Sequence, residues 1–278
     1  MTRNAKPRKK PPHSRRMNRV EDITPYGTEG DSRAKGSQVR DMFDKIAPAY
    51  DRMNRMMTFG LDNGWRRRSI SRVAGENPAT VLDLACGTAD MTIMLAEAIP
   101  GATITGADLS EGMLEVGRRK VEKKGLSDRI DLRRADALQL PFADETFDAI
   151  TIAFGVRNFE DLPAGYAEMS RVLRKGGTIT VLELTPPAKS WIKPFYRFYT
   201  RCIIPAVGRM MSDDNRAYAY LPESIAAVPS RLDMTAIMEQ NGFEEASFKD
   251  LTFGVAAIYT ARKRVRNSPK PTPDSQNR

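Results

Sequence analysis

The sequence predicts an α/β protein with a doubly wound, mostly parallel sheet. Short runs rich in Val, Ile, Leu and Thr alternate with helical patterns between residues 80 and 184. The chain has 278 residues, of which 41% are hydrophobic, so it can bury a core of ordinary size. Strand, helix and strand in regular alternation indicate a parallel sheet that helices cover on both faces.

The individual elements follow from these patterns, and hydrophobic periodicity separates strands from helices. Five strands are expected first, at Thr80–Ala85, Thr103–Asp108, Ile130–Ala135, Phe147–Ala153 and Thr178–Leu184. Helices are expected between them, at Thr88–Ile99, Ser110–Lys124 and Ala164–Arg174. The run Lys175-Gly176-Gly177 is typical of a glycine that stops a helix.

The alternation changes after Leu184. A helical region is predicted from Trp191 to about Met211, and another helix from about Leu232 to Asn241. Two late strands, Glu244–Leu251 and Val255–Arg262, are joined by a short turn, so they should be antiparallel neighbours at a sheet edge. The expected sheet therefore has seven strands, with extra helices at the N-terminus and before the last two strands.

Charge divides the chain into three parts. Residues 1–40 carry 11 Lys and Arg against 4 Asp and Glu, and residues 262–278 carry 6 against 1. We expect basic, disordered tails at 1–37 and 264–278 and one folded domain at 38–263. The tails suit an anionic lipid surface, RNA or simple solubility. Because the middle of the chain carries 27 Lys and Arg against 30 Asp and Glu, its folded face should bind no specific nucleic acid.

Several classes of chemistry lack their usual residues. The one histidine is His13, in the basic leader, and neither Cys86 nor Cys202 belongs to a Cys-x-x-Cys pair. No metal site and no histidine-based triad is therefore expected. No run approaches the roughly 20 apolar residues of a spanning helix. A reducing, cytoplasmic location is the prediction, with peripheral contact at the inner face of the membrane left open.

Polar residues at the carboxyl ends of the strands predict the site, because ligands of such sheets bind there. Asp108 follows Gly87 by 21 residues, the spacing at which an acid accepts hydrogen bonds from ribose hydroxyls. Asp90 stands where a pyrophosphate would lie, and with Asp83 and Asp108 it predicts a pocket for a cation. S-adenosylmethionine is an adenosine that carries a sulfonium and an ammonium group. Alternatively, Asp90 and Asp108 only cap helices.

The remaining cofactor contacts follow from the same argument. Asp136 and Ala137 would offer a side-chain acceptor and a backbone N–H to the adenine edge, and Thr88 would hydrogen-bond the methionine end. Asp136 is also a common turn residue, so its sequence position alone leaves both roles open.

The chain resembles the UbiE/MenG quinone C-methyltransferases, within the class I S-adenosylmethionine-dependent group with its Rossmann-like fold. The resemblance covers about residues 38 to 263. It is carried by Met42-Phe43-Asp44-Lys45-Ile46-Ala47-Pro48-Ala49-Tyr50-Asp51-Arg52-Met53-Asn54, Leu82-Asp83-Leu84-Ala85-Cys86-Gly87-Thr88, Phe154-Gly155-Val156-Arg157-Asn158-Phe159, Arg171-Val172-Leu173-Arg174-Lys175-Gly176-Gly177 and Tyr218-Ala219-Tyr220-Leu221-Pro222-Glu223-Ser224-Ile225. Ala89 and Ala153 depart from the family, where a glycine and, in some relatives, a serine stand.

The resemblance implies methylation of a ring carbon of a prenylated quinol, demethylmenaquinol to menaquinol, in menaquinone biosynthesis. It also implies cofactor contacts at Thr88, Asp108, Asp136 and Ala137. A precursor of ubiquinone or another small acceptor is the alternative substrate, and an RNA-associated methyltransferase or binding module is a remote alternative. The oligomeric state and the length of the prenyl chain stay open.

Ionising a phenol near neutral pH requires positive charge or hydrogen-bond donors beside the oxyanion. Arg157 and Asn158, beyond the fourth strand, are the predicted catalytic residues, with arginine as an electrostatic stabiliser because it stays protonated. The base is water or a carboxylate such as Asp51. A structural ion pair is the alternative role for Arg157.

Aromatic and basic residues are interleaved from Trp191 to Tyr199. This segment could admit a prenyl tail or rest on a bilayer surface. The packing of an added helix pair in the core would explain the same pattern.

Overall fold

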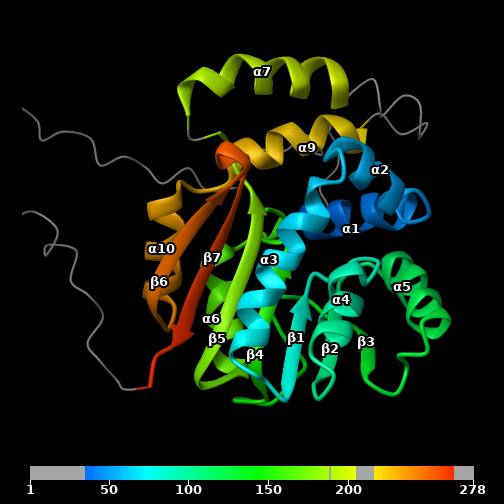
Figure 1. Ribbon diagram of the computed structural model, residues 1–278, viewed down its shortest axis with the longest axis vertical. Helices are drawn as coiled ribbons and strands as arrows, with labels where there is room; N and C mark the ends of the chain where they lie inside the picture. Colours follow the sequence, from blue (N-terminus) through cyan, green and yellow to red (C-terminus); the bar gives the residue numbers. More distant parts are fainter. Residues whose placement is uncertain (1–34, 188, 205–215, 266–278) are drawn as a thin grey trace, which may run out of the picture.

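The computed structural model describes residues 35–187, 189–204 and 216–265, and within these it confirms the predicted fold class. Seven strands form one sheet in the order β3-β2-β1-β4-β5-β7-β6. The pairs β1–β2, β2–β3, β1–β4 and β4–β5 are parallel, whereas β7 is antiparallel to both β5 and β6 (Figure 1). The strand order reverses beside β1, so the carboxyl ends of β1, β2 and β4 meet at the switch point where ligands of such sheets bind.

The bounds of the elements lie close to those expected from the sequence. The strands are β1 (Thr80–Leu84), β2 (Thr103–Asp108), β3 (Ile130–Arg134), β4 (Phe147–Ala153), β5 (Leu173–Leu184), β6 (Phe243–Leu251) and β7 (Ala256–Lys263). The helices are α1 (Lys35–Ile46), α2 (Tyr50–Met57), α3 (Leu61–Gly75), α4 (Asp90–Ala98), α5 (Glu111–Lys123), α6 (Leu162–Val172), α7 (Lys193–Phe198), α9 (Arg216–Ala227) and α10 (Arg231–Gln240). Short helical turns are η2 (Val156–Asn158), η3 (Ser190–Ile192), η4 (Tyr199–Ile203) and η5 (Thr252–Gly254).

Helices cover both faces of the sheet. One core cluster joins α3, α4 and α5 to the sheet through residues such as Val73, Leu95 and Leu114. A second joins α6 and α10 to the other face through Tyr166 and Met238. The helices α1, α2, α7 and α9 form a cap above the carboxyl ends of the strands (Figure 1). Burial of these apolar faces stabilises the packing of the helices on the sheet. The carboxyl ends of the strands face the cap instead (Figure 1).

The sequence suggested that the glycine pair Gly176-Gly177 stops the preceding helix, but in the structure α6 ends before it. α6 ends at Val172, and β5 begins at once with Leu173. The pairing of β4 with β5 shifts register between Phe147 and Ala149. A Cβ on Gly177 would lie 2.7 Å from the carbonyl oxygen of Asp148, so the irregular strand needs a residue without a side chain there.

The helical region predicted from Trp191 is confirmed as far as the structure describes it. It consists of η3, α7 and η4 in direct succession, and its predicted end at Met211 lies outside the described residues. α9 occupies a stretch for which the sequence indicated no specific helix. Pro194 starts α7 in the first turn, where its missing N–H costs nothing.

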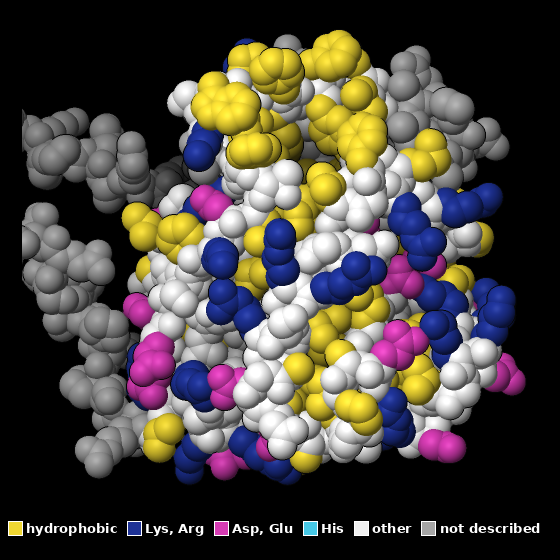
Figure 2. Space-filling view, viewed as in Figure 1, with side chains coloured by type: hydrophobic (Ala, Val, Ile, Leu, Met, Phe, Trp, Pro, Cys, Tyr) yellow, Lys and Arg dark blue, Asp and Glu magenta, His cyan; other side chains and the backbone are white. Residues whose placement is uncertain are grey.

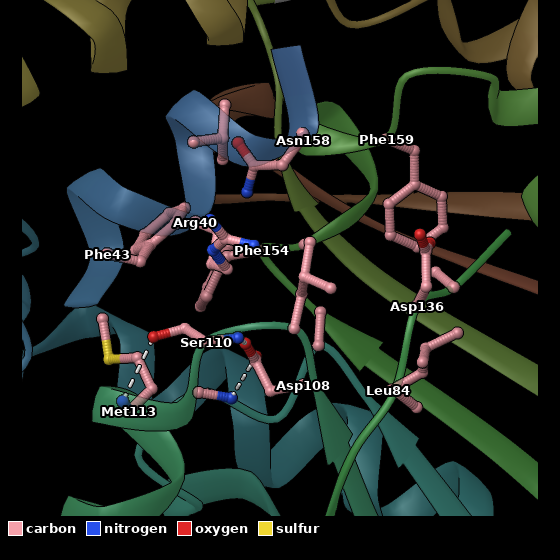
Figure 3. A pocket seen from close by; sticks show the side chains of 18 of the residues that line it. Arg40, Phe43, Leu84, Asp108, Ser110, Met113, Asp136, Phe154, Asn158 and Phe159 are labelled. Carbon is pink, nitrogen blue, oxygen red and sulfur yellow. Dashed lines mark hydrogen bonds between the residues drawn. The ribbon is translucent and has the colours of Figure 1, made fainter. Parts of the chain in front are cut away.

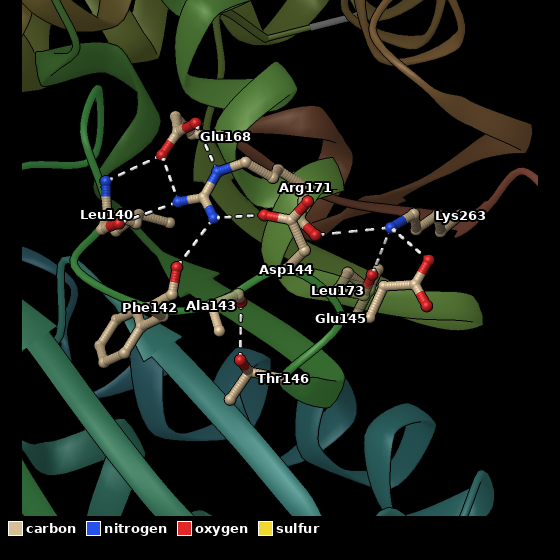
Figure 4. Close-up of polar contacts among 10 residues, drawn as sticks. All are labelled: Leu140, Phe142, Ala143, Asp144, Glu145, Thr146, Glu168, Arg171, Leu173 and Lys263. Carbon is tan, nitrogen blue, oxygen red and sulfur yellow. Dashed lines mark hydrogen bonds and ion pairs between the residues drawn. The ribbon is translucent and has the colours of Figure 1, made fainter.

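The connection between β3 and β4 is fixed by Arg171 of α6. Its guanidinium donates to the carbonyl oxygens of Leu140, at 2.9 Å, and Phe142, at 2.8 Å, and it also pairs with Glu168 and Asp144 (Figure 4). Glu168 in turn accepts a hydrogen bond from the backbone N–H of Leu140. The Arg171 segment that resembles the family therefore has a structural role, because it holds this connection in place.

The two late strands pair as predicted, and β7 lies between β5 and β6, which takes the edge. The predicted tails fall almost entirely outside the described residues, although α1 begins at Lys35 within the first of them. In the described ranges, no helix combines the length and apolar character needed to cross a bilayer.

Candidate active site

A cavity with about 880 Å³ of empty space lies at the carboxyl ends of β1, β2 and β4 (Figure 3). Its charged lining residues are Arg40, Asp108, Asp136 and Glu160, so acids outnumber bases. We call it the acidic cavity. Gly87 lies in its wall at a φ of +55°, with only Tyr50 within 4 Å of where a Cβ would be, so the turn brings bare backbone to the ligand.

Asp108 is held in this cavity by backbone hydrogen bonds. Its two carboxylate oxygens accept backbone hydrogen bonds from Gly87, at 2.8 Å, and Ser110, at 2.9 Å. Burial raises the pKa of Asp108, although these N–H donors act against the shift. Each oxygen keeps a further acceptor position, which suits the hydroxyl groups of a ribose.

Asp136 and Ala137 line the same cavity. One oxygen of Asp136 accepts from the backbone N–H of Leu138, which is the turn role that the sequence left open. Phe159 lies beside Asp136 in the wall, which adds an aromatic face (Figure 3). This part of the cavity can therefore hold a flat, polar ring such as adenine.

Thr88 and Asp51 lie together behind the turn, and neither is among the described residues that line the acidic cavity. The hydroxyl of Thr88 donates to Asp51, and the ammonium of Lys120 donates to Asp51 at 2.9 Å. Lys120 also pairs with Asp90. These contacts tie α2 to the turn after β1 and to α5.

The predicted cluster of three acids is therefore only partly formed. Asp83 is fully buried and accepts hydrogen bonds from Thr92, at 2.6 Å, and Thr151, at 2.9 Å. Burial raises its pKa to about 6. Because Asp90 pairs with Lys120, Asp108 is the one member of the three that lines the acidic cavity in the described part of the chain.

Arg157 and Asn158 lie on η2, shortly after β4, but they line different cavities. The Arg157 guanidinium donates to Glu183 at 2.6 Å, and the side chains are 6% and 0% exposed. Burial alone would lower the pKa of Arg157, but the negative charge of Glu183 raises it overall. Asn158 lines the acidic cavity and accepts a hydrogen bond from Tyr220 at 2.8 Å. The ion pair proposed as an alternative for Arg157 is thus present.

A second cavity, with about 1,110 Å³ of empty space, lies under the cap. Its lining comes mainly from α2, α3, α7 and α9, and most of it is apolar; we call it the apolar cavity. Tyr50 and Phe154 line both cavities, so they form the wall between them. Arg157 lines the apolar cavity, and so do Tyr196 and Tyr199. Burial raises the pKa of both tyrosines to about 12, so their hydroxyls are donors and not bases.

The aromatic segment from Trp191 to Tyr199 is only partly packed in the core. Ile192 and Ile204 are buried, but Trp191, Phe195 and Phe198 are 60%, 72% and 63% exposed. Phe195 also lines the apolar cavity. Hydrophobic side chains gather at the top of the molecule, where α7 lies (Figure 2). The core-packing interpretation is therefore wrong for these three aromatic side chains.

Sequence reasoning missed Glu183 and Arg66. Glu183 is a buried acid in the otherwise apolar end of β5, and that contrast is a signal the sequence does contain. Arg66 is 7% exposed on α3, and no local pattern distinguishes it from its exposed neighbours Arg67 and Arg68.

The two residues that depart from the family pattern, Ala89 and Ala153, both lie near the turn after β1 or in the acidic cavity. Ala89 adopts a φ of +64°, so a non-glycine residue occupies a left-handed position there, at some cost in strain. Ala153 lines the acidic cavity with its small side chain. In the described ranges, no group of three or more His, Cys, Asp and Glu side chains could hold a metal.

Comparison with known proteins gives consistent matches. The model of the ubiE/COQ5 methyltransferase family matches residues 31–263. The chain is 44% identical to a demethylmenaquinone methyltransferase of Bacteroides fragilis, over 87% of this chain and 98% of that one. It is 46% identical to one of Thermus thermophilus, over 78% and 98%. It is 41% identical to the ubiquinone/menaquinone biosynthesis C-methyltransferase UbiE of Geobacter sulfurreducens, over 84% and 91%.

Solved structures agree on the fold alone, because their sequence identities are low. The [4+2]-cyclase SpnF superposes with a TM-score of 0.63 at 18% identity, over 83% of this chain and 97% of that one. A SAM dependent methyltransferase from Aquifex aeolicus gives 0.51 at 16% identity, over 70% and 89%. The family match over most of the chain and the strand-end cavity lead to one conclusion: the protein belongs to the ubiE/COQ5 methyltransferase family.

Proposed function

We propose that the protein methylates a ring carbon of a prenylated naphthoquinol, converting demethylmenaquinol and S-adenosylmethionine to menaquinol and S-adenosylhomocysteine. Family membership supports the reaction type, and the names of the relatives from Bacteroides fragilis and Thermus thermophilus support this acceptor. The observation that carries the proposal is the shared wall: Tyr50 and Phe154 separate an acidic cavity from an apolar one. A cationic donor and an apolar acceptor would meet there.

The acidic cavity fits S-adenosylmethionine. The ribose hydroxyls would donate to the carboxylate of Asp108, whose two oxygens are already aligned by backbone N–H groups. Asp136 and the backbone of Ala137 would contact adenine, beside Phe159. The excess of acids favours a sulfonium and an ammonium over a pyrophosphate. Thr88 does not line this cavity, so it would influence the cofactor indirectly, by fixing the backbone of the neighbouring Gly87.

The apolar cavity supplies the conditions for the chemistry. Arg157 offers positive charge to the ring oxygen as the phenol ionises, and Glu183 holds its guanidinium in place. Tyr196 is a neutral hydrogen-bond donor in the same cavity. When bound, S-adenosylmethionine supplies an electrophilic methyl carbon, which the ring carbon takes as the carbon–sulfur bond breaks. The ring proton then leaves to a base.

Asn158 and Asp51 complete the proposal. Asn158, held by Tyr220, faces the acidic cavity and would orient the donor near the wall. Asp51 is bound to Thr88 and Lys120 and lies outside the described lining of both cavities. These contacts favour a positioning role for Asp51 and leave water as the base.

The decisive measurement is methyl transfer from labelled S-adenosylmethionine to reduced demethylmenaquinone and, in parallel, to a reduced ubiquinone precursor, with product masses determined. We expect transfer to the naphthoquinol. Transfer to the ubiquinone precursor alone would reassign the substrate, and cofactor binding without transfer to either acceptor would overturn the quinone proposal.

We also propose that the protein contacts a bilayer surface through Trp191, Phe195 and Phe198. Phe195 also lines the apolar cavity, as does Phe59, which is 71% exposed. Hydrophobic side chains gather on the surface where α7 lies (Figure 2). A prenylated substrate resides in membranes because its tail is apolar, so this position would let the quinol enter without crossing water. Sedimentation with phosphatidylcholine vesicles should decrease when Phe195 and Phe198 are both changed to Ser, and equal sedimentation would contradict the proposal.

A further inference from the structure

Two buried arginines line the apolar cavity, and both have an unsatisfied hydrogen-bond donor. The Nε atoms of Arg66 and Arg157 are buried without a hydrogen-bond partner among the described residues. The two side chains are 9% and 6% exposed. Burying a polar donor without a partner destabilises a fold, so each such group needs an explanation, such as a bound ligand, a catalytic role or an ordered water. Arg157 already has a proposed role, but Arg66 does not.

The two guanidinium groups differ in how completely they are paired. Glu183 accepts from Arg157 at 2.6 Å, so that charge is well compensated. The nearest acid to Arg66 is Asp62, with 3.8 Å between Nε and the carboxylate oxygen, which is too long for a hydrogen bond. Asp62 itself accepts a 2.7 Å bond from Thr58. Arg66 therefore has hydrogen-bonding capacity to offer within the cavity.

Both arginines contact Phe154. The guanidinium carbon of Arg66 lies 5.2 Å from the centroid of the Phe154 ring, and the Arg157 guanidinium donates to the Phe154 carbonyl oxygen. Phe154 also borders the acidic cavity, from which the methyl group would come. An acceptor ring that binds against Phe154 would therefore lie close to both guanidinium groups.

We propose that Arg66 is a specificity-determining residue that donates hydrogen bonds to the second ring oxygen of the acceptor. This inference rests on the proposed function. A quinol carries two oxygens on opposite sides of its ring, and two arginines from different elements can each receive one. Arg157 would then stabilise the oxygen that ionises, while Arg66 would fix the rotation of the ring and so select which carbon faces the donor. A site built for a second oxygen should discriminate against an acceptor that lacks it.

The test compares a short-chain prenylated naphthoquinol with the matching mono-hydroxy naphthalene. In the full-length protein, the quinol should have a kcat/KM at least about tenfold higher than that of the mono-ol, the scale of one lost polar contact. Arg66→Gln should abolish most of this preference by raising KM for the quinol, without weakening S-adenosylmethionine binding. Arg66→Lys, which keeps a cationic donor, should restore part of the preference. Arg68→Gln, an exposed change on the same helix, is the matched control and should alter nothing.

The outcomes separate this inference from the proposed function. If the wild-type protein methylates the quinol but uses the mono-ol equally well, no second-oxygen contact exists and the role of Arg66 is overturned, even if Arg66→Gln fails to fold. If Arg66→Gln lowers kcat/KM for both acceptors by the same factor, its role is structural. If the wild type methylates neither acceptor, the proposed function itself fails.

Discussion

At the scale of single residues, Asp108 is the clearest test of the donor site. In Asp108→Asn an amide NH₂ would replace one oxygen that now accepts from Gly87 or Ser110, so an N–H would face an N–H. Leaving such a buried donor unpaired costs about 1–3 kcal/mol. We expect the affinity for S-adenosylmethionine, measured by calorimetry, to fall at least about tenfold. Asp131→Asn, an exposed change on β3, should leave the affinity unchanged.

Arg157 and Glu183 allow stability and catalysis to be separated. Arg157→Gln leaves the fully buried Glu183 without its cation, which should lower the free energy of unfolding by about 3–5 kcal/mol. The double change Arg157→Gln with Glu183→Gln removes both charges, so it should recover most of that stability in urea unfolding. Methyl transfer should stay low in the double variant. Full recovery of turnover would show that the ion pair is only structural.

The titration of Asp83 predicts a pH dependence of stability. Its carboxyl group loses a proton near 3.8 when unfolded but near 6 when folded, so between these values the folded state binds more protons. This contribution to stability therefore falls as the pH rises from about 4 to 6, by up to about 3 kcal/mol, and is constant above that.

Asp83→Asn resembles the protonated form and should escape this loss. The free energy of unfolding of the variant, relative to wild type, should increase between pH 4 and pH 7, as measured by urea denaturation. Other titrating groups are shared by both proteins and cancel in the difference. A difference independent of pH would contradict the raised pKa of Asp83.

At the scale of elements, α1 is attached to the start of α5 above the acidic cavity. The carboxylate of Asp44 accepts from the Ser110 hydroxyl at 2.6 Å and from the backbone N–H of Gly112 at 2.9 Å. An acid at a helix N-terminus is favourable because free N–H groups point there. This contact explains why an Asp in the family-like N-terminal segment matters to a cavity formed by distant strands.

Gly112 and Gly64 provide a matched pair for this contact. A Cβ on Gly112 would lie 3.1 Å from the backbone of Asp44, whereas one on Gly64 in α3 would meet nothing within 4 Å. Gly112→Ala should push α1 away and weaken S-adenosylmethionine binding. Gly64→Ala should leave binding unchanged and raise the free energy of unfolding by up to about 1 kcal/mol through helix propensity. Equal effects of the two changes would show that α1 does not close the cavity.

Most of the elements, though not all, could be predicted from the sequence. Runs rich in Val, Ile, Leu and Thr, alternating with helical patterns, were enough to place the first four strands, the end of β5 and the intervening helices. The irregular start of β5 was not predictable, because Gly176-Gly177 is equally compatible with a helix stop and a strand irregularity. Only the shifted pairing with β4 distinguishes the two.

At the scale of the whole molecule, helices of the cap line both cavities. α2, α3, α7 and α9 enclose an apolar cavity, and α7 presents exposed aromatic side chains beside it. The net positive charge of the sequence comes from its two ends, residues 1–40 and 262–278.

Removal of the tails should leave the reaction intact, because the residues that line both cavities lie between 35 and 265. A chain of residues 35–265 should methylate a short-chain quinol as fast as the full chain, and it should lose any affinity for RNA that the basic ends confer. Filter binding with RNA and the methyl-transfer assay, run on both chains, measure this. Lost turnover in the shortened chain would contradict this prediction, because the reaction would then need the tails.

The sequence by itself determined the fold class and which residues at the strand ends line the acidic cavity. Parallel strands end at one edge, so polar residues after several strands must gather there, and Asp108, Asp136, Ala137 and Asn158 do line one cavity. Only the tertiary structure decided the contacts between elements: Asp51 with Thr88, Glu183 with Arg157, and Arg66 in the apolar cavity. The physical reason is that local periodicity specifies which face of an element is buried. What that face meets depends on how distant helices pack over the sheet.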